Sequence, residues 1–230
     1  EIDMTNQLSD DFFEILGGPR PENPFDLLDA YRFDLCFRQM DSGSVLDVGA
    51  YLGDFLKLVI SDGREAFGSE INDTRVKLVN SIVGSGVARL GFRNGVLDNF
   101  ESNSVDNVVC METVEHIIDD QFAVSELCRV ARKRVVITVP YRERVEQILC
   151  MHCNSFTPHH GHQHTYDDGS FKQLVPNGWK IVKEKSFAAR ITRMVRRLLP
   201  ETKISIPLLR WLDKVVPGSG RWLLIVLEVA

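Results

Sequence analysis

Short apolar segments alternate with amphipathic segments along most of the chain. The apolar segments have the length of buried strands, whereas the amphipathic segments repeat apolar residues every three or four positions, as helices do. Strands are therefore expected at 44–50, 65–71, 88–95, 104–112, 133–140, 179–187 and 221–230, and helices at 25–40, 54–63, 73–86 and 120–131. This order predicts an α/β fold with a doubly wound, mainly parallel sheet of seven strands and helices on both faces.

The alternation is interrupted in three places, which suggests how the chain is organised. Residues 1–40 read as a polar arm rich in Gly and Pro followed by a helix, and 41–230 as a single domain. That domain carries a Cys/His-rich insert at 141–168 and a basic amphipathic insert at 188–220. Asp73 is expected to cap the helix that begins there.

Composition narrows the class of protein. The chain has 44% hydrophobic and 26% charged residues and a net charge of −5, which is ordinary for a globular protein and argues against a general nucleic-acid-binding surface. It has no apolar run near the roughly 20 residues that span a bilayer, and an acidic start unlike a signal peptide. The five cysteines are scattered and odd in number, which does not suggest a disulfide framework. We expect a cytoplasmic protein.

A glycine loop follows the strand that begins at 44. It has the pattern Asp-x-Gly-x-x-x-Gly, with Asp47, Gly49 and Gly53 at the spaced positions and Ala50 and Tyr51 between them. In an open α/β sheet such a loop lies at the carboxyl ends of the strands, where ligands bind. A pyrophosphate would need a glycine where Tyr51 stands, and Asp47 would repel it. The loop therefore favours a cationic nucleoside without phosphates.

An acidic residue ends the next strand, about 20 residues beyond the loop. Glu70, followed by Ile71, stands where a carboxylate would accept hydrogen bonds from the two ribose hydroxyls of a nucleoside. Its position agrees with the ligand that the glycine loop predicts.

These features resemble motif I and its partners in class I S-adenosylmethionine-dependent methyltransferases, of the small-molecule type similar to the ubiquinone-biosynthesis-like methyltransferase domain. The resemblance covers 44–140 well and 160–185 loosely. It implies a Rossmann-like fold, S-adenosylmethionine as the cofactor and a small-molecule acceptor. Gly95 stands where the family usually has an acidic residue, so the residue that receives the adenine amino group stays open. The cofactor-binding residues that it implies are Asp47, Gly49, Ala50, Tyr51, Gly53, Glu70, Ile71, Val96, Leu97 and Met111.

The same resemblance places Glu112, at the end of the strand 104–112, at the reaction centre. The dipeptide Glu115-His116 that follows matches one that is common in the family, and its alternative role is only to tie a helix to a loop. The Gly-His element at 161–162 resembles one that lines the acceptor pocket. His162 or His164 would then take the proton of the acceptor.

Five of the six histidines lie in the Cys/His-rich insert, and three interpretations of them stay open. In the first, Cys150, Cys153, His159 and His162 form a zinc site, because thiolates and imidazoles suit that metal. The second is the acceptor-side role of His162 or His164. The third is a solvated loop.

The basic insert at 188–220 mixes arginines and lysines with large apolar residues. The pattern suits a peripheral contact with an anionic lipid surface, an acidic acceptor, a partner subunit, or a plain pair of packed helices.

Two other classes of function compete with methyl transfer. An NAD-dependent oxidoreductase would share the fold and Glu70 but requires the glycine that Tyr51 replaces. A non-catalytic zinc-binding scaffold would keep the fold for partner binding alone.

Overall fold

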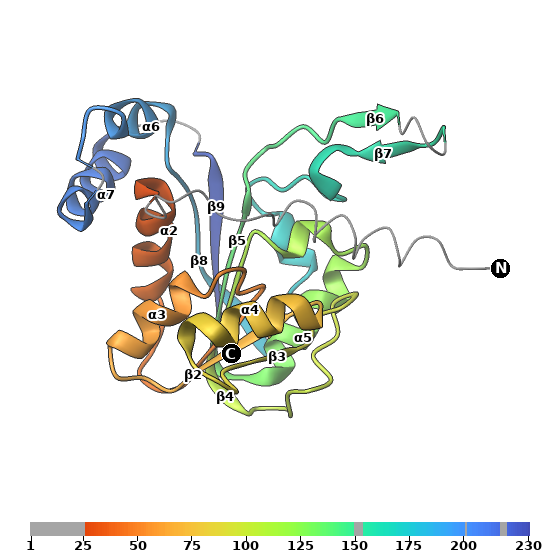
Figure 1. The fold of residues 1–230 in the computed structure, drawn as a ribbon. Coiled ribbons are helices and arrows are strands. Elements are labelled where there is room, and N and C mark those ends of the chain that lie inside the picture. Colours follow the sequence, from red (N-terminus) through yellow and green to blue (C-terminus); the bar gives the residue numbers. More distant parts are fainter. Residues whose placement is uncertain (1–25, 150–153, 201, 217–219) are drawn as a thin grey trace.

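The computed structural model describes residues 26–149, 154–200, 202–216 and 220–230 of the chain. A seven-stranded sheet with the order β3-β2-β1-β4-β5-β9-β8 forms its centre (Figure 1). Neighbouring strands from β3 to β5 run parallel, and β9 runs antiparallel to both β5 and β8. The strands are β1 Val45–Val48, β2 Ala66–Glu70, β3 Ala88–Leu90, β4 Val105–Met111, β5 Ala131–Pro140, β8 Trp179–Phe187 and β9 Trp222–Val229. This is the predicted fold class.

Helices cover both faces because successive side chains on a strand point to opposite sides. One face packs Val109, Val136 and Leu224 against helices α2, α3 and α7. The other packs Val108, Ile137 and Ile225 against α5. The helices are α2 Leu27–Phe37, α3 Asp54–Ser61, α4 Asp73–Val83, α5 Asp120–Val130, α6 Arg190–Arg196 and α7 Ile206–Val215, and 3-10 turns occupy Val114–His116, His159–Gly161, Ser170–Gln173 and Lys203–Ser205.

The N-cap of α4 differs from the prediction by one residue. Asn72 is the cap, with an extended backbone and a side-chain oxygen that accepts the Arg75 N–H at 2.9 Å. Asp73 is already helical and adds negative charge to the first turn, where it suits the helix dipole. Asn and Asp cap equally well, so the sequence alone does not separate the two neighbours.

Both inserts have regular structure. The Cys/His-rich insert contains the antiparallel pair β6 Gln147–Leu149 and β7 Phe156–Pro158, which extends away from the sheet in Figure 1. The basic insert contributes α6 and α7, which contact each other and α2. It is thus a pair of packed helices within the described residues. None of the helices described is both long and apolar enough to cross a membrane.

The strand order places a ligand site between two particular strands. From β1 the chain moves outward to β2 and β3, then returns to place β4 on the other side of β1. Connections leave β1 and β4 in opposite directions, which opens a crevice at the carboxyl ends of these strands.

Candidate active site

A cleft of about 930 Å³ lies at this crevice. Its walls come from the loop after β1, the ends of β2 and β4, the turn after β3, helix α2 and the two inserts. The residues predicted from the sequence that line it are Asp47, Gly49, Ala50, Tyr51, Glu70, Ile71, Met111, Glu112 and His162. Gly53, Val96, Leu97 and His164 are predicted site residues that do not line it.

The two glycines of the loop are required by its geometry. Gly49 has φ +77°, and a side chain there would overlap the hydroxyl of Thr113. Gly53 has φ +71° and begins α3, where an added Cβ would lie 2.8 Å from Val83. Only glycine adopts this backbone conformation without strain. Gly53 does not line the cleft, but it allows the loop to turn into α3 and to pack closely against α4.

Tyr51 occupies the position where a dinucleotide loop has its middle glycine. Its φ is +51° and its ring, half exposed, lies under the guanidinium of Arg75 with 4.9 Å from Cζ to the ring centroid. The backbone N–H of Tyr51 donates a hydrogen bond to Oε1 of Glu70. The backbone of Tyr51 thus contacts Glu70, while its half-exposed ring lies against Arg75.

Two buried carboxyl groups form the floor of the cleft near this loop. Burial raises the pKa of Glu70 to about 7, although bonds from the Tyr51 and Ile71 N–H groups and the charge of Arg75 oppose the shift. Burial and the charge of Glu70 raise the pKa of Asp47 to about 8, and Arg32 opposes that shift. Oδ1 of Asp47 is buried and accepts no hydrogen bond from any described residue. The floor therefore offers acceptor oxygens to the hydroxyl and ammonium donors of a ligand.

The turn after β3 brings other residues to the cleft than the predicted pair Val96 and Leu97. Phe92, Arg93 and Asn94 line the cleft, in place of Val96 and Leu97. Leu97 is fully buried in the core, and its N–H donates to Glu126 at 3.1 Å. The difference arises because Phe92 and Asn94 take φ near +65° and +51°, which folds the chain back on itself. The Asn-Gly pair at 94–95 is a turn signal that favours this earlier reversal.

Glu112 stands at the end of β4 beside Met111, inside the cleft. Its carboxylate accepts a hydrogen bond from the Thr138 hydroxyl at 3.1 Å and lies 3.7 Å from a guanidinium nitrogen of Arg32. Burial raises the pKa of this carboxyl, and Arg32 and Thr138 oppose the rise. Glu112 is thus held in place by α2 and β5.

Glu115, His116 and His162 form a second cluster in the cleft. One ligand atom from each lies within 4.8 Å of the others, a spacing that could hold a metal ion. Glu115 is 1% exposed, and neither of its carboxylate oxygens accepts a hydrogen bond from another described residue. Carboxylate oxygen and imidazole nitrogen together suit a divalent cation such as zinc or manganese.

The two imidazoles of this cluster differ in their surroundings. Nδ1 of His162 pairs with a carboxylate oxygen of Glu143. The His116 ring meets the His162 ring edge-on, with 4.7 Å between centroids. Burial, followed by the nearby His162, lowers the pKa of His116 to about 4, so this ring is neutral at physiological pH. Glu115 and His116 both line the cleft, and the backbone oxygen of Glu115 accepts the Gln163 N–H at 2.7 Å, which ties this turn to the insert.

The remaining predicted residues of the insert lie elsewhere. His164 is turned away from the cleft: its Nε2 lies 2.8 Å from the carbonyl oxygen of Ile117, and its Nδ1 lies 3.6 Å from Asp120. These contacts fit a structural tie in place of the expected base. Cys150 and Cys153 lie outside the described residues, as does the side chain of His159, and so therefore does the predicted zinc site.

A comparison with protein families decides the class of this domain. Residues 46–139 match the family model of the methyltransferase domain. This part of the chain is an S-adenosylmethionine-dependent methyltransferase domain of class I. The match covers the glycine loop, Glu70 and Glu112. A comparison with curated proteins finds no match.

Solved structures of methyltransferases share the fold at low sequence identity. One from Archaeoglobus fulgidus is 16% identical, with 98% of this chain and 100% of that chain covered and a TM-score of 0.58. One from Mesorhizobium loti is 11% identical, with 88% and 100% covered and a TM-score of 0.60. The [4+2]-cyclase SpnF is 15% identical, with 98% and 94% covered and a TM-score of 0.61. The methyltransferase fold thus carries more than one reaction, and neither the NAD-dependent oxidoreductase nor the zinc-binding scaffold finds support in these comparisons.

The cleft of the methyltransferase domain fits the cofactor of its class. Glu70 and Asp47, which are 6% and 2% exposed, present acceptor oxygens at the loop. A ribose supplies hydroxyl donors, and the methionine part of the cofactor supplies an ammonium group.

Proposed function

We propose that the protein transfers the methyl group of S-adenosylmethionine to a small acceptor bound beside Glu112, Glu115 and His162. The observation that carries the proposal is that two different sets of residues line one cleft. The first set is the glycine loop with Glu70, which we call the cofactor end, and the second is the cluster of Glu115, His116 and His162, which we call the acceptor end.

At the cofactor end, the residues of this chain would bind and orient S-adenosylmethionine. Glu70 would accept hydrogen bonds from both ribose hydroxyls. The turn at Phe92 to Asn94 would contact the adenine of the cofactor. Asp47 would face the cationic part of the cofactor, since its buried Oδ1 accepts no hydrogen bond from any described residue. S-adenosylmethionine supplies an activated methyl group on its sulfonium, and the protein's contribution is alignment for in-line displacement.

At the acceptor end, His162 is the candidate base. Because Glu143 holds Nδ1, the other ring nitrogen can take a proton from the acceptor. The nucleophilic atom forms a bond to the methyl carbon as the carbon–sulfur bond breaks. The electron pair stays on sulfur, and the acceptor's proton moves to His162. A cation held by Glu115, His116 and His162 would instead lower the pKa of an acceptor hydroxyl.

The walls suggest the charge of the acceptor. Arg193 of α6 and Arg221 line the cleft together with Arg32 of α2. Arg32 is paired with Asp29 and Glu112, but Arg193 and Arg221 would suit an acceptor that carries a carboxylate or another anionic group. Arg193 is the residue of the basic insert that supports an acidic acceptor.

Binding of S-adenosylhomocysteine by isothermal titration calorimetry tests the cofactor end. We expect saturable binding that Glu70→Ala weakens and Glu101→Ala, at an exposed site, leaves unchanged. No heat from S-adenosylhomocysteine, or equal heat from NAD, would contradict the proposal.

Transfer of a labelled methyl group tests the reaction itself. Pools of small carboxylic acids, phenols and amines would be incubated with labelled cofactor, before and after dialysis against a chelator. Labelled product that persists after dialysis supports His162 as the base. Activity that returns only with an added divalent cation supports metal-assisted transfer, and cofactor binding without any labelled product would argue for a different reaction on this fold.

A further inference from the structure

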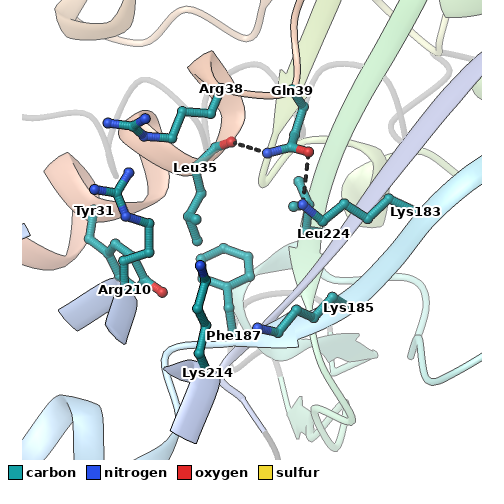
Figure 2. A pocket seen from close by; sticks show the side chains of 10 residues that line it. All are labelled: Tyr31, Leu35, Arg38, Gln39, Lys183, Lys185, Phe187, Arg210, Lys214 and Leu224. Atoms are coloured by element: carbon teal, nitrogen blue, oxygen red, sulfur yellow. Dashed lines mark hydrogen bonds between the residues drawn. The ribbon is translucent and has the colours of Figure 1, made fainter. Parts of the chain in front are cut away.

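A second hollow of about 460 Å³ lies between α2, α7 and the sheet edge formed by β8 and β9, and shares no lining residue with the cleft. Phe187 and Leu224 form an apolar floor. Cationic side chains from three separate elements surround that floor (Figure 2): Arg38, Lys183, Lys185, Arg210 and Lys214.

The local sequence explains why these cations meet. An irregularity in the pairing of β8 with β9 falls between Ile181 and Lys183. Ile181 packs against the core under α5, whereas Lys183, Lys185 and Phe187 alternate onto the face that α2 and α7 cover. The bulge therefore directs two lysines beneath α7. There Arg210 and Lys214 stand one turn apart and so share one side of the helix.

The described carboxylates pair with the two arginines of the hollow and with none of its lysines. Asp34 pairs with Arg38 at 2.9 Å and with Arg210 at 3.1 Å. Nζ of Lys183 donates to the amide oxygen of Gln39 at 2.9 Å, a neutral acceptor (Figure 2). The carboxylate of Asp213 is occupied by Tyr31, Thr192 and two backbone N–H groups.

The three lysines therefore have no ion pair with any described residue. Among the described residues, Nζ of Lys185 donates to the backbone oxygen of Asp213, at 3.2 Å. Burial and repulsion from Lys185 and Lys214 lower the pKa of Lys183, as expected for like charges placed close together.

We propose that this hollow binds a phosphate ester. Lys183, Lys185 and Lys214 would donate to its oxygens, and the floor of Phe187 and Leu224 would contact the carbon atoms next to the phosphate. A concave surface with one sign of charge concentrates counter-ions of the opposite sign. The source is a soluble phosphate ester or a lipid headgroup. Exposed Leu208, Trp211 and Val215 on α7 would contact acyl chains in the second case.

Calorimetry with sn-glycerol 3-phosphate at low salt tests the site. We expect saturable binding that Lys185→Gln with Lys214→Gln weakens at least tenfold. The matched control is Lys77→Gln with Lys172→Gln, which removes the same charge at exposed positions outside the hollow. Affinity for S-adenosylhomocysteine should be unchanged in both, which separates this site from the proposed function.

Sedimentation with phosphatidylglycerol and phosphatidylcholine vesicles distinguishes the sources. Binding to anionic vesicles that glycerol 3-phosphate competes away identifies a lipid headgroup, and binding of the soluble probe without vesicle binding identifies a soluble ester. Either result supports the site. The proposal is overturned if neither probe binds, or if the Lys185/Lys214 variant binds as the wild type does.

Discussion

The backbone N–H of Tyr51 donates a hydrogen bond to the carboxylate of Glu70. This bond joins the loop after β1 to the end of β2, so the two predicted parts of the cofactor site are held as one unit. It also explains how tyrosine serves at a position where related loops have glycine. The backbone of Tyr51 faces the carboxylate, while its ring lies against Arg75 outside that contact.

Replacing Glu70 by Gln should weaken binding of S-adenosylhomocysteine by about 10- to 100-fold, because a hydrogen bond to a charged group contributes about 1.5–3 kcal/mol. Calorimetry would measure the change, with Glu101→Gln as the control. A variant that binds as tightly as the wild type would show that the ribose lies elsewhere.

Cofactor affinity should depend on pH through the same carboxyl. The pKa of Glu70 is raised to about 7, so the group becomes protonated as pH falls from 8 to 6 and accepts hydrogen bonds less well. Binding of S-adenosylhomocysteine should weaken over this range. Because the pKa of Asp47 is raised to about 8, Glu70→Gln should remove the change near pH 7 and leave the contribution of Asp47.

Stability of the free protein should change in the opposite direction. The folded state holds the proton of Glu70 more tightly than the unfolded chain does. Its contribution to the free energy of unfolding is therefore full below about pH 4.5 and is lost as pH rises to about 7. Urea unfolding across this range, compared between wild type and Glu70→Gln, would measure it.

Gly49→Ala and Gly63→Ala form a matched pair, because both glycines have φ near +78° but differ in their surroundings. Backbone strain alone should cost each variant about 1–2 kcal/mol. At Gly49 the added methyl also overlaps Thr113, so we expect a larger loss of stability and loss of cofactor binding. At Gly63 the added methyl meets open space, so the Gly63→Ala variant should bind the cofactor normally. Equal unfolding midpoints in urea would contradict this account.

His162→Ala and His164→Ala should separate catalysis from stability. Loss of His162 should lower kcat by about 100-fold or more, as expected for a general base, with little change in the free energy of unfolding. Loss of His164 removes contacts to Ile117 and Asp120 and should destabilise the fold by about 1–2 kcal/mol with kcat retained. Initial rates and urea unfolding on both variants test this, and the reverse pattern would exchange the roles.

Asp213 anchors the basic insert to the rest of the protein. Its carboxylate accepts the hydroxyl of Tyr31 at 2.7 Å and the N–H groups of Ala188 and Ala189 at 2.6 and 3.1 Å. Asp213→Ala should lower the free energy of unfolding by about 2–4 kcal/mol, since several buried donors lose their acceptor at once. Because α6 also carries Arg193 into the cleft, KM for an acidic acceptor should rise. Glu101→Ala is the control for a lost surface carboxylate.

The sequence by itself determined the order of strands and helices, the two loop glycines and the place of Glu70. Each of these depends on a local pattern: the periods of strand and helix, and a strand end where parallel sheets always present their ligands. Only the tertiary structure shows that His162 lines the cleft and His164 does not, and that the turn at Phe92 lines it in place of the pair Val96 and Leu97. Neighbouring loop residues point in opposite directions according to backbone angles that distant contacts select. For the same reason the sequence did not reveal the lysine-lined hollow, because Lys183 and Lys214 lie far apart in the chain and line one hollow only in the folded protein.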